Sequence, residues 1–465
     1  MIVHLGAYDA AASALRESGF TPASFDGAAG TAEENIRLTD EKLAACEQED
    51  KRLTDKLTAL AGDVPAIRLA ADRCTQEISK AQAADRLAHS ERTFCLDGWV
   101  PCEDIPKLEA LLEKFCCAWE LEDPSPEEYP DVPVKLKNNR LTWPLNMVTE
   151  MYSLPAYDGV DPNPLMAPFF ILFYGIMMAD MGYGLVMVLA ALIALGKMKP
   201  KRGSKYFCEL LLACGVSTFL LGIVTGGFFG NAVPTIVKMF GHDVQLGILT
   251  SPLLDPLKDT TTILIGAMVL GFIQLVTGMI VNMVMECRQG KVGDAIFNEG
   301  TWLVLFAGLA LYVLKIGNIA GVPVVLCIGG LMLLYGSGRE AKGFGKVTAV
   351  FGALYNGLTG WFGDILSYSR LMALMLAGSV IAQVFNTLAA MPSSGGVTVV
   401  SMLVFILIFL VGHALNFGLN LLGCFVHDLR LQCLEFFGKF YVDGGKPFSP
   451  LEINTRYVDV ENHNF

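Results

Sequence analysis

Arg370 is the residue of this sequence whose setting points most directly to chemistry. It is the only lysine or arginine between Lys346 and Arg430, in the apolar stretch Leu366-Ser367-Tyr368-Ser369-Arg370-Leu371-Met372-Ala373-Leu374. An arginine stays charged at physiological pH, and a guanidinium in lipid costs several kcal/mol. Arg370 must therefore face a carboxylate, a cavity or water. A buried structural ion pair is the alternative interpretation.

The helical face that carries Arg370 is small and polar. On a wheel of about 100° per residue it also holds Asn356, Thr359, Gly363, Ser367 and Ala377. Such a face lets another helix approach closely. Asp364 lies six residues away and roughly 120° round the wheel, so it is a poor partner within the helix. We therefore expect the counter-ion of Arg370 to come from another subunit.

A second polar stripe runs along the last apolar segment. Six of its residues fall within about 100° of one another: His413, Asn416, Asn420, Gly423, His427 and Arg430. A stripe of this length predicts an aqueous path, and interhelical hydrogen bonding is the alternative. Glu435 and Lys439 have the spacing of a helical salt bridge. The remaining acids, which lie near segment ends, are interpreted as structural: Asp180, Glu209, Glu286 and Glu299.

No motif predicts catalysis or metal binding by this chain. The sequence has no G-x-x-x-x-G-K-[ST], H-E-x-x-H or G-x-S-x-G pattern, and its 12 cysteines form no C-x-x-C pair. We expect no catalytic residue, no metal and no cofactor. The net charge of −12 excludes a basic nucleic-acid-binding protein.

The composition predicts a membrane protein, since 53% of the residues are apolar and only 17% are charged. Eight apolar runs of near-spanning length are expected. The first two are either two short helices or one tilted helix. The last two are too long to cross upright, so they must tilt, break or protrude. The runs are at about 165–180, 182–196, 206–229, 260–286, 299–316, 320–336, 347–390 and 397–440.

Basic residues predict the orientation of these segments. If the N-terminal half is cytoplasmic, each even-numbered segment returns to a basic cluster, whereas the outside loops hold only Lys238, Lys258 and Lys315. This bias predicts eight crossings of the cell membrane with both termini in the cytoplasm. The returning clusters contain Lys197, Lys199, Lys201, Arg202 and Lys205, then Arg288 and Lys291, then Arg339, Lys342 and Lys346, and finally Lys439 and Lys446.

The first 160 residues are acidic, with 16 Lys/Arg against 29 Asp/Glu, whereas the rest carries a net charge of +1. We expect a cytoplasmic soluble domain over 1–130, a linker over 131–164, a transmembrane domain over 165–445 and a cytoplasmic tail over 446–465. Apolar heptads predict a coiled-coil hairpin at 31–92, turning at Gly62 and Pro65; a short helical bundle is the alternative. A small α/β lobe is expected at 93–121. The predicted fold class is mainly α, a polytopic helical membrane domain with these soluble additions.

The arginine segment resembles the essential-arginine helix of subunit I of V-type ATPases, the 116 kDa or a-subunit family. Residues 425–441, which include His427, Arg430, Glu435 and Lys439, resemble the last helix of that family. Residues 178–184 and 98–101 also match family patterns. The match covers nearly the whole chain, although family members have a longer N-terminal domain. Where eukaryotic relatives carry a histidine and a glutamate, this chain has Gly378 and Asn420.

The resemblance implies a stator that forms two ion half-channels against a ring of c (proteolipid) subunits. Protons or sodium ions would pass, coupled to ATP hydrolysis or synthesis by other V-type ATPase subunits, and the soluble half would bind peripheral-stalk subunits. A secondary ion-coupled transporter is the alternative, and a membrane-embedded enzyme lacks a catalytic constellation. The residues implied in ion translocation are Arg370, Arg430, His427, Asn420, Asn416, His413, Ser367, Asp364 and Glu435.

Overall fold

The computed structural model divides the chain into two compact units, residues 1–98 with 450–465 and residues 99–449. The division at residue 98 falls inside the α/β lobe predicted at 93–121. The residues described are 6, 10, 13–15, 30–198, 200, 202–240, 252–314, 318–319, 322–338, 345–393, 398–450 and 455–458. Lys199, Lys201, Lys315, Arg339 and Lys342, used above to predict orientation, lie outside them.

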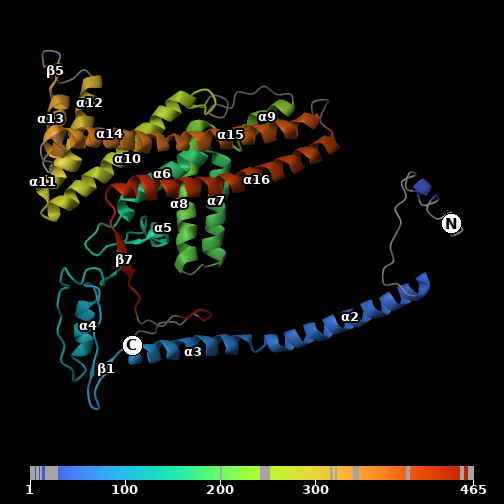
Figure 1. Cartoon of the computed structure of the whole chain (residues 1–465). Coiled ribbons are helices and arrows are strands. Elements are labelled where there is room, and N and C mark those ends of the chain that lie inside the picture. Colours follow the sequence, from blue (N-terminus) through green and yellow to red (C-terminus); the bar gives the residue numbers. More distant parts are fainter. Residues whose placement is uncertain are drawn as a thin grey trace. The chain divides into compact units, whose positions relative to one another are not determined.

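Two helices dominate the first unit, α2 (Ala32–Ala61) and α3 (Val64–Asp85). They follow each other end to end, so the hairpin predicted over 31–92 is wrong (Figure 1). Gly62 and Asp63 keep right-handed helical backbone angles, and Pro65 lies in the first turn of α3, where its missing N–H removes no helical hydrogen bond. The heptad leucines are consequently exposed, Leu53 by 48% and Leu57 by 69%.

The C-terminal tail binds to α3 through one buried carboxylate. Asp72 is only 5% exposed, and its carboxylate accepts the backbone N–H groups of Arg456, Tyr457 and Val458 at 2.9 to 3.0 Å. The rest of the described first unit includes a small antiparallel pair of strands, β1 (Ala88–His89) and β2 (Phe94–Cys95). Part of the predicted tail is therefore docked on the N-terminal helices.

The segment predicted as a linker, 131–164, is folded. It contributes β3 (Pro133–Val134), β4 (Leu154–Pro155) and the short helix α5 (Asn146–Tyr152). The strand β7 (Asp443–Pro447), which follows the last membrane helix, lies between β3 and β4. Its pairing is parallel to β3 and antiparallel to β4, so both ends of the membrane domain meet in one sheet. The region predicted as an α/β lobe contains the helix α4 (Ile105–Leu112).

The membrane domain has helices at all eight predicted segments, which confirms the mainly α fold. Among the described residues, six helical stretches are long and apolar enough to cross a bilayer, and Asn163–Met178 and Val324–Gly336 are shorter. The first apolar stretch is two helices, because the chain turns at Ala179 (φ 29°) and Asp180. The helices of the membrane domain that precede the two long segments include α6 (Asn163–Met178), α7 (Met181–Ile193), α8 (Arg202–Thr225), α9 (Ala232–Met239), α10 (Thr260–Arg288), α12 (Thr301–Val313) and α13 (Val324–Gly338).

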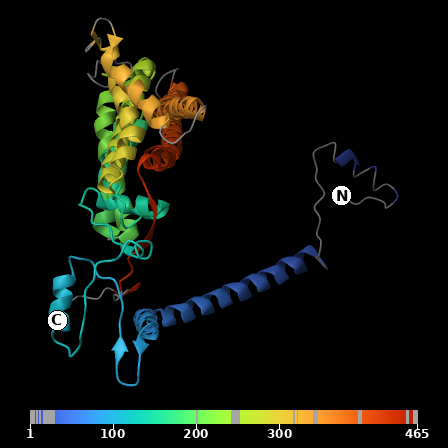
Figure 2. The same ribbon diagram turned by 60° about the vertical axis from the view of Figure 1, so that its left-hand side comes forward.

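The two long segments cross the other helices at a steep angle (Figure 1). The first, α14 (Gly345–Ser367) with α15 (Ser369–Ala390), packs beside the second, α16 (Val399–Arg430). Figure 2 shows both on one side of the green and yellow helices. With extensions they reach 46 and 41 residues, about 69 and 62 Å at 1.5 Å per residue, against a hydrocarbon core of about 30 Å. The first of them breaks between α14 and α15, which is one of the three predicted arrangements.

The break falls at Tyr368, between α14 and α15. Its fully buried ring packs on Gly271 of α10, where an added Cβ would lie only 2.2 Å from the ring. Beyond α16, a π-helical turn (Leu431–Phe436) and a 3-10 turn (Phe437–Lys439) continue the second segment. Arg370 therefore starts a helix and Arg430 ends one.

Candidate functional site

Arg370 lies two residues after the break, with its Nη1 buried and without a hydrogen-bond partner among the described residues. No ion pair to Arg370 occurs in the described part of the chain. The charges that act on it are those of Arg430 and Glu435, and both arginines act on His427. Nδ1 of His427 and Oε2 of Glu435 are likewise buried and unpartnered among the described residues. Three polar side chains near this point, Arg370, His427 and Glu435, thus each have a buried atom that could form a further hydrogen bond.

The salt bridge predicted between Glu435 and Lys439 is wrong. Lys439 instead bonds Asp364 of α14 at 2.6 Å and lies 4.3 Å from the centre of the Trp361 ring. The π-helical turn changes the spacing that would have brought Glu435 and Lys439 to one face. Ser367 donates to the carbonyl of Gly363 in its own helix. Asp364 is therefore held by a cation of this chain.

His413 and Asn416 of the polar stripe are enclosed by hydrogen bonds. The His413 ring hydrogen-bonds the Tyr183 hydroxyl at 2.7 Å and the side-chain Oδ1 of Asn386 at 2.9 Å. Asn416 donates to the Tyr183 hydroxyl and to the carbonyl of Gly378, and both stripe residues are less than 5% exposed. In this structure these two residues make the interhelical hydrogen bonds of the alternative interpretation.

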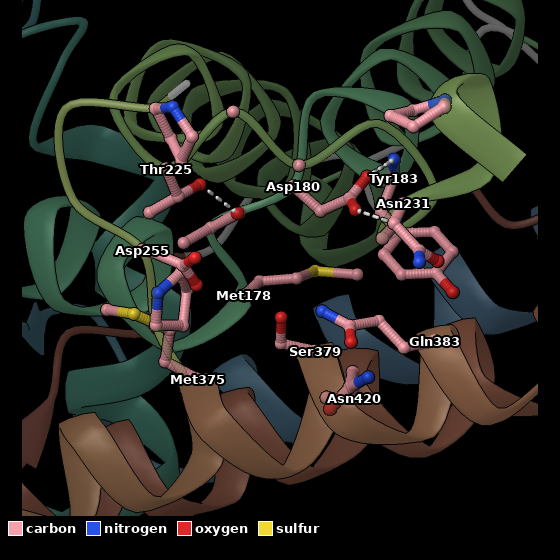
Figure 3. A pocket seen from close by; sticks show the side chains of 18 residues that line it. Met178, Asp180, Tyr183, Thr225, Asn231, Asp255, Met375, Ser379, Gln383 and Asn420 are labelled. Carbon is pink, nitrogen blue, oxygen red and sulfur yellow. Dashed lines mark hydrogen bonds between the residues drawn. The ribbon is translucent and has the colours of Figure 1, made fainter. Parts of the chain in front are cut away.

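Asn420, one turn further along the stripe, lines a cavity of about 230 Å³ (Figure 3). It donates to Asn416 and faces Gly378, where an added Cβ would lie 2.9 Å from its Nδ2. The two positions that depart from the eukaryotic pattern are therefore in contact. The cavity is lined mainly by residues 178–183 at the α6–α7 turn, 225–234 after α8, Asp255, and 375–383 of α15.

Asp180 is the carboxylate of this cavity that sequence reasoning assigned to a helix end. It does cap α7, since its Oδ1 accepts the N–H groups of Gly182 and Tyr183. It also accepts from Phe229 at 3.0 Å and Gly230 at 2.7 Å, across the fold. Only the Asp-Met-Gly pattern between two apolar runs could have indicated the cap, and nothing local indicated the second pair of donors.

A second cavity, of about 360 Å³, lies at the other end of the two long segments. It touches Ala353 and Trp361 of α14, Glu299 near α12, and Lys439 beyond α16. Glu299 accepts a hydrogen bond from Asn282 of α10. The first cavity meets the same two segments at 375–383 and Asn420. Along both segments, the two cavities therefore lie on opposite sides of Arg370 and Arg430.

Both arginines lie in a region that is similar to known proteins. Residues 24–219 and 361–453 match the model of the V-type ATPase 116 kDa subunit family. The chain is 34% identical to A-type ATP synthase subunit I of Methanocaldococcus jannaschii, over 96% of the chain and 68% of that protein. It is also 34% identical to A-type ATP synthase subunit I of Pyrococcus horikoshii, over 83% and 58%, and 27% identical to V-type ATP synthase subunit I of Borreliella burgdorferi, over 76% and 59%. The chain thus spans 58 to 68% of the length of these relatives.

Proposed function

Because the chain belongs to the V-type ATPase 116 kDa subunit family, we propose that it is the membrane stator subunit of a rotary ATPase or ATP synthase. In this proposal it forms two half-channels against a ring of c subunits and conducts protons or sodium ions. ATP hydrolysis or synthesis takes place on other subunits. The observation that carries the proposal is an arginine between two cavities whose buried Nη1 has no hydrogen-bond partner in the described part of the chain.

The proposed orientation of the helices makes the cavities open on opposite sides. With the N-terminal part in the cytoplasm and eight crossings, the α6–α7 turn and the loop that holds Asp255 lie outside. The first cavity, lined by both, is then the outer half-channel. The second cavity touches Glu299, which follows the cytoplasmic end of α10, and is then the inner half-channel. Both termini are cytoplasmic in this arrangement.

Arg370 separates the two half-channels in this mechanism. An ion enters one half-channel, neutralises a ring carboxylate, travels round with the ring and leaves through the other. The fixed charge of Arg370 attracts the ionised carboxylate, which promotes ion release, and it repels a cation that would pass directly between the cavities. The buried Nη1 of Arg370, which has no hydrogen-bond partner among the described residues, supports this role, because it can donate to a carboxylate of another subunit.

Exposed apolar side chains around both arginines support a ring contact. On α16, Leu419 and Leu422 lie within about 80° of Arg430, and they are 60% and 65% exposed. On α15, Val384 lies within about 40° of Arg370 and is 51% exposed. A charged group in the middle of such a surface is costly against lipid, whereas a ring that carries carboxylates compensates it. The N-terminal helices would serve the peripheral stalk.

Copurification tests the proposal against a secondary ion-coupled transporter with its own substrate pocket. The tagged chain, purified in mild detergent from its native membrane, should bring down a c ring and ATPase subunits. A chain that purifies alone, while reconstituted vesicles still show solute-driven ion flux, would favour the transporter. Mass spectrometry of the purified material identifies the partners.

A further inference from the structure

A buried chain of hydrogen bonds links the segments that carry the two arginines. The Tyr368 hydroxyl donates to Oε1 of Gln274 at 2.9 Å, and Nε2 of Gln274 donates to Oε1 of Gln432 at 2.5 Å. Nε2 of Gln432 in turn donates to the Asp428 carboxylate at 3.2 Å. All four side chains are fully buried. Each of these hydrogen bonds joins one donor to one acceptor, so the series of hydrogen bonds runs in a single direction across three helices.

Gln274 is the centre of this chain, and it belongs to α10, which carries neither arginine. Tyr368 precedes Arg370 by two residues, and Gln432 follows Arg430 by two. The hydrogen bonds to α10 therefore hold each of the two segments at a position two residues from an arginine.

The face of α10 around Gln274 is shaped for the same two segments. Gly271, one turn before it, leaves room for the Tyr368 ring, and Gly278, one turn after it, lies against Phe436 and Lys439. Cβ atoms at Gly271 and Gly278 would lie 2.2 Å from the Tyr368 ring and 3.2 Å from Lys439, respectively. Because the helices approach this closely at Gly271 and Gly278, the side-chain hydrogen bonds form only when the helices are aligned at these residues.

We propose that Gln274 is a positioning residue that fixes the spacing between Arg370 and Arg430. This inference rests on the proposed function only for the consequence of that spacing, which is how the ring carboxylate meets the two charges. The amide is suited to the task because it binds one segment with its oxygen and the other with its nitrogen. An apolar side chain of similar size fills the volume but specifies neither contact.

The direct test is a distance measurement. Spin labels at Leu366 and Leu434, which are exposed on the two segments, report their separation in the full chain in lipid nanodiscs. We expect a narrow distance distribution in the otherwise unchanged chain and a broadened or shifted one in Gln274→Leu. The matched control is Thr277→Val on α10, whose hydroxyl donates to the Ile273 carbonyl of its own helix; it should leave the distribution unchanged. An unchanged distribution in Gln274→Leu would overturn the inference.

Transport by the assembled complex supplies the second readout. Gln274→Leu should lower ATP-driven ion uptake by about tenfold or more, as misplacement of a reacting group by about 1 Å does, with no loss of assembled subunits. Broadened distances with normal uptake would show that the spacing has no functional role and would also overturn the inference. If Gln274→Leu fails to assemble, Tyr368→Phe keeps the ring on Gly271, removes one link, and should give the same two changes more weakly. The nanodisc measurement stands whether or not Arg370 proves essential, so the two proposals fail separately.

Discussion

Lys439 and Arg370 are two cations near the same helical segment with opposite surroundings. Lys439 has a carboxylate at 2.6 Å and an aromatic face at 4.3 Å, both from α14. Arg370 has a buried nitrogen with no partner in the described chain. A cation held by its own chain is structural, whereas one left without a partner is available to another molecule. This contrast supports the proposal that Arg370, and not Lys439, pairs with a carboxylate of another subunit.

The structural role of Lys439 leads to a stability prediction. Lys439→Met should destabilise the membrane domain by about 1–3 kcal/mol, because the half-buried Asp364 carboxylate loses its cation. The double variant Lys439→Met with Asp364→Asn should recover part of that loss, as expected for directly coupled partners. Thermal unfolding of the full chain in detergent measures both. If the stability lost by the double variant equals the sum of the losses in the two single variants, the two side chains are not coupled.

The isolation of Arg370 could be predicted from the sequence, but its neighbours could not. One arginine among 83 residues without another lysine or arginine is visible in the order of residues alone. Gln274 hydrogen-bonds residues that are 94 and 158 positions away in the sequence, and Asp180 hydrogen-bonds residues that are 49 and 50 positions away. Such distant contacts leave no local pattern in the sequence. The Glu435–Lys439 prediction was wrong for a related reason: it assumed a regular α-helix where a π-helical turn occurs.

At the scale of elements, apolar length was a reliable guide and the heptad pattern was not. Each of the eight apolar runs is helical, because in a bilayer a helix satisfies the hydrogen bonds of its own backbone. Heptads show that a helix has an apolar seam, but they do not say what covers it. With Gly62 and Asp63 in helical conformation, α2 and α3 continue in one direction, and Leu53 and Leu57 remain exposed.

The tail bound to α3 gives a prediction at this scale. Asp72→Ala should release residues 456–458, because three backbone N–H groups lose their only described acceptor. Hydrogen exchange of these amides, followed by mass spectrometry on the full chain, should become faster, by about tenfold for each 1.4 kcal/mol of protection that is lost. Glu77→Ala, an exposed acid on the same helix, is the control. Equal exchange rates in both variants would mean that the tail is held by other contacts.

The orientation of the membrane helices is a further prediction for the elements. Single cysteines at Arg288 and at Lys258 lie at opposite ends of α10. In right-side-out cells an impermeant thiol reagent should label the cysteine at position 258 and should reach position 288 only after permeabilisation. The reverse pattern would contradict the proposed topology and would exchange the two half-channels.

At the scale of the whole molecule, the membrane domain combines a fixed charge with two separate cavities, of about 230 and 360 Å³. The first cavity has the Asp180 carboxylate and Asn420, and the second has Glu299 and Lys439. Neither cavity alone accounts for transport, because each ends short of the arginines along the two long segments. A carrier that moves between them is required, and in the proposal the c ring is that carrier. In the same proposal, the charge of Arg370 keeps the two spaces from acting as one channel.

Arg430 should be more tolerant of substitution than Arg370. It is exposed at the end of α16, where a long side chain reaches water, whereas Arg370 is partly buried at the start of α15. Arg430→Lys should therefore retain most of the ATP-driven uptake, and Arg370→Lys should lose nearly all of it, because lysine lacks the planar fork and the very high pKa of arginine. Similar losses in both variants would show that the two arginines act as one unit.

ATP-driven ion uptake by reconstituted vesicles tests the central claim most directly. The complex with Arg370→Ala should assemble in normal yield, should fail to pump, and should let ions leak down an imposed gradient. Arg288→Ala, an exposed arginine at the end of α10, is the matched control and should pump normally. Normal ATP-driven uptake by the Arg370→Ala complex would contradict the assignment of Arg370 as the barrier between two half-channels.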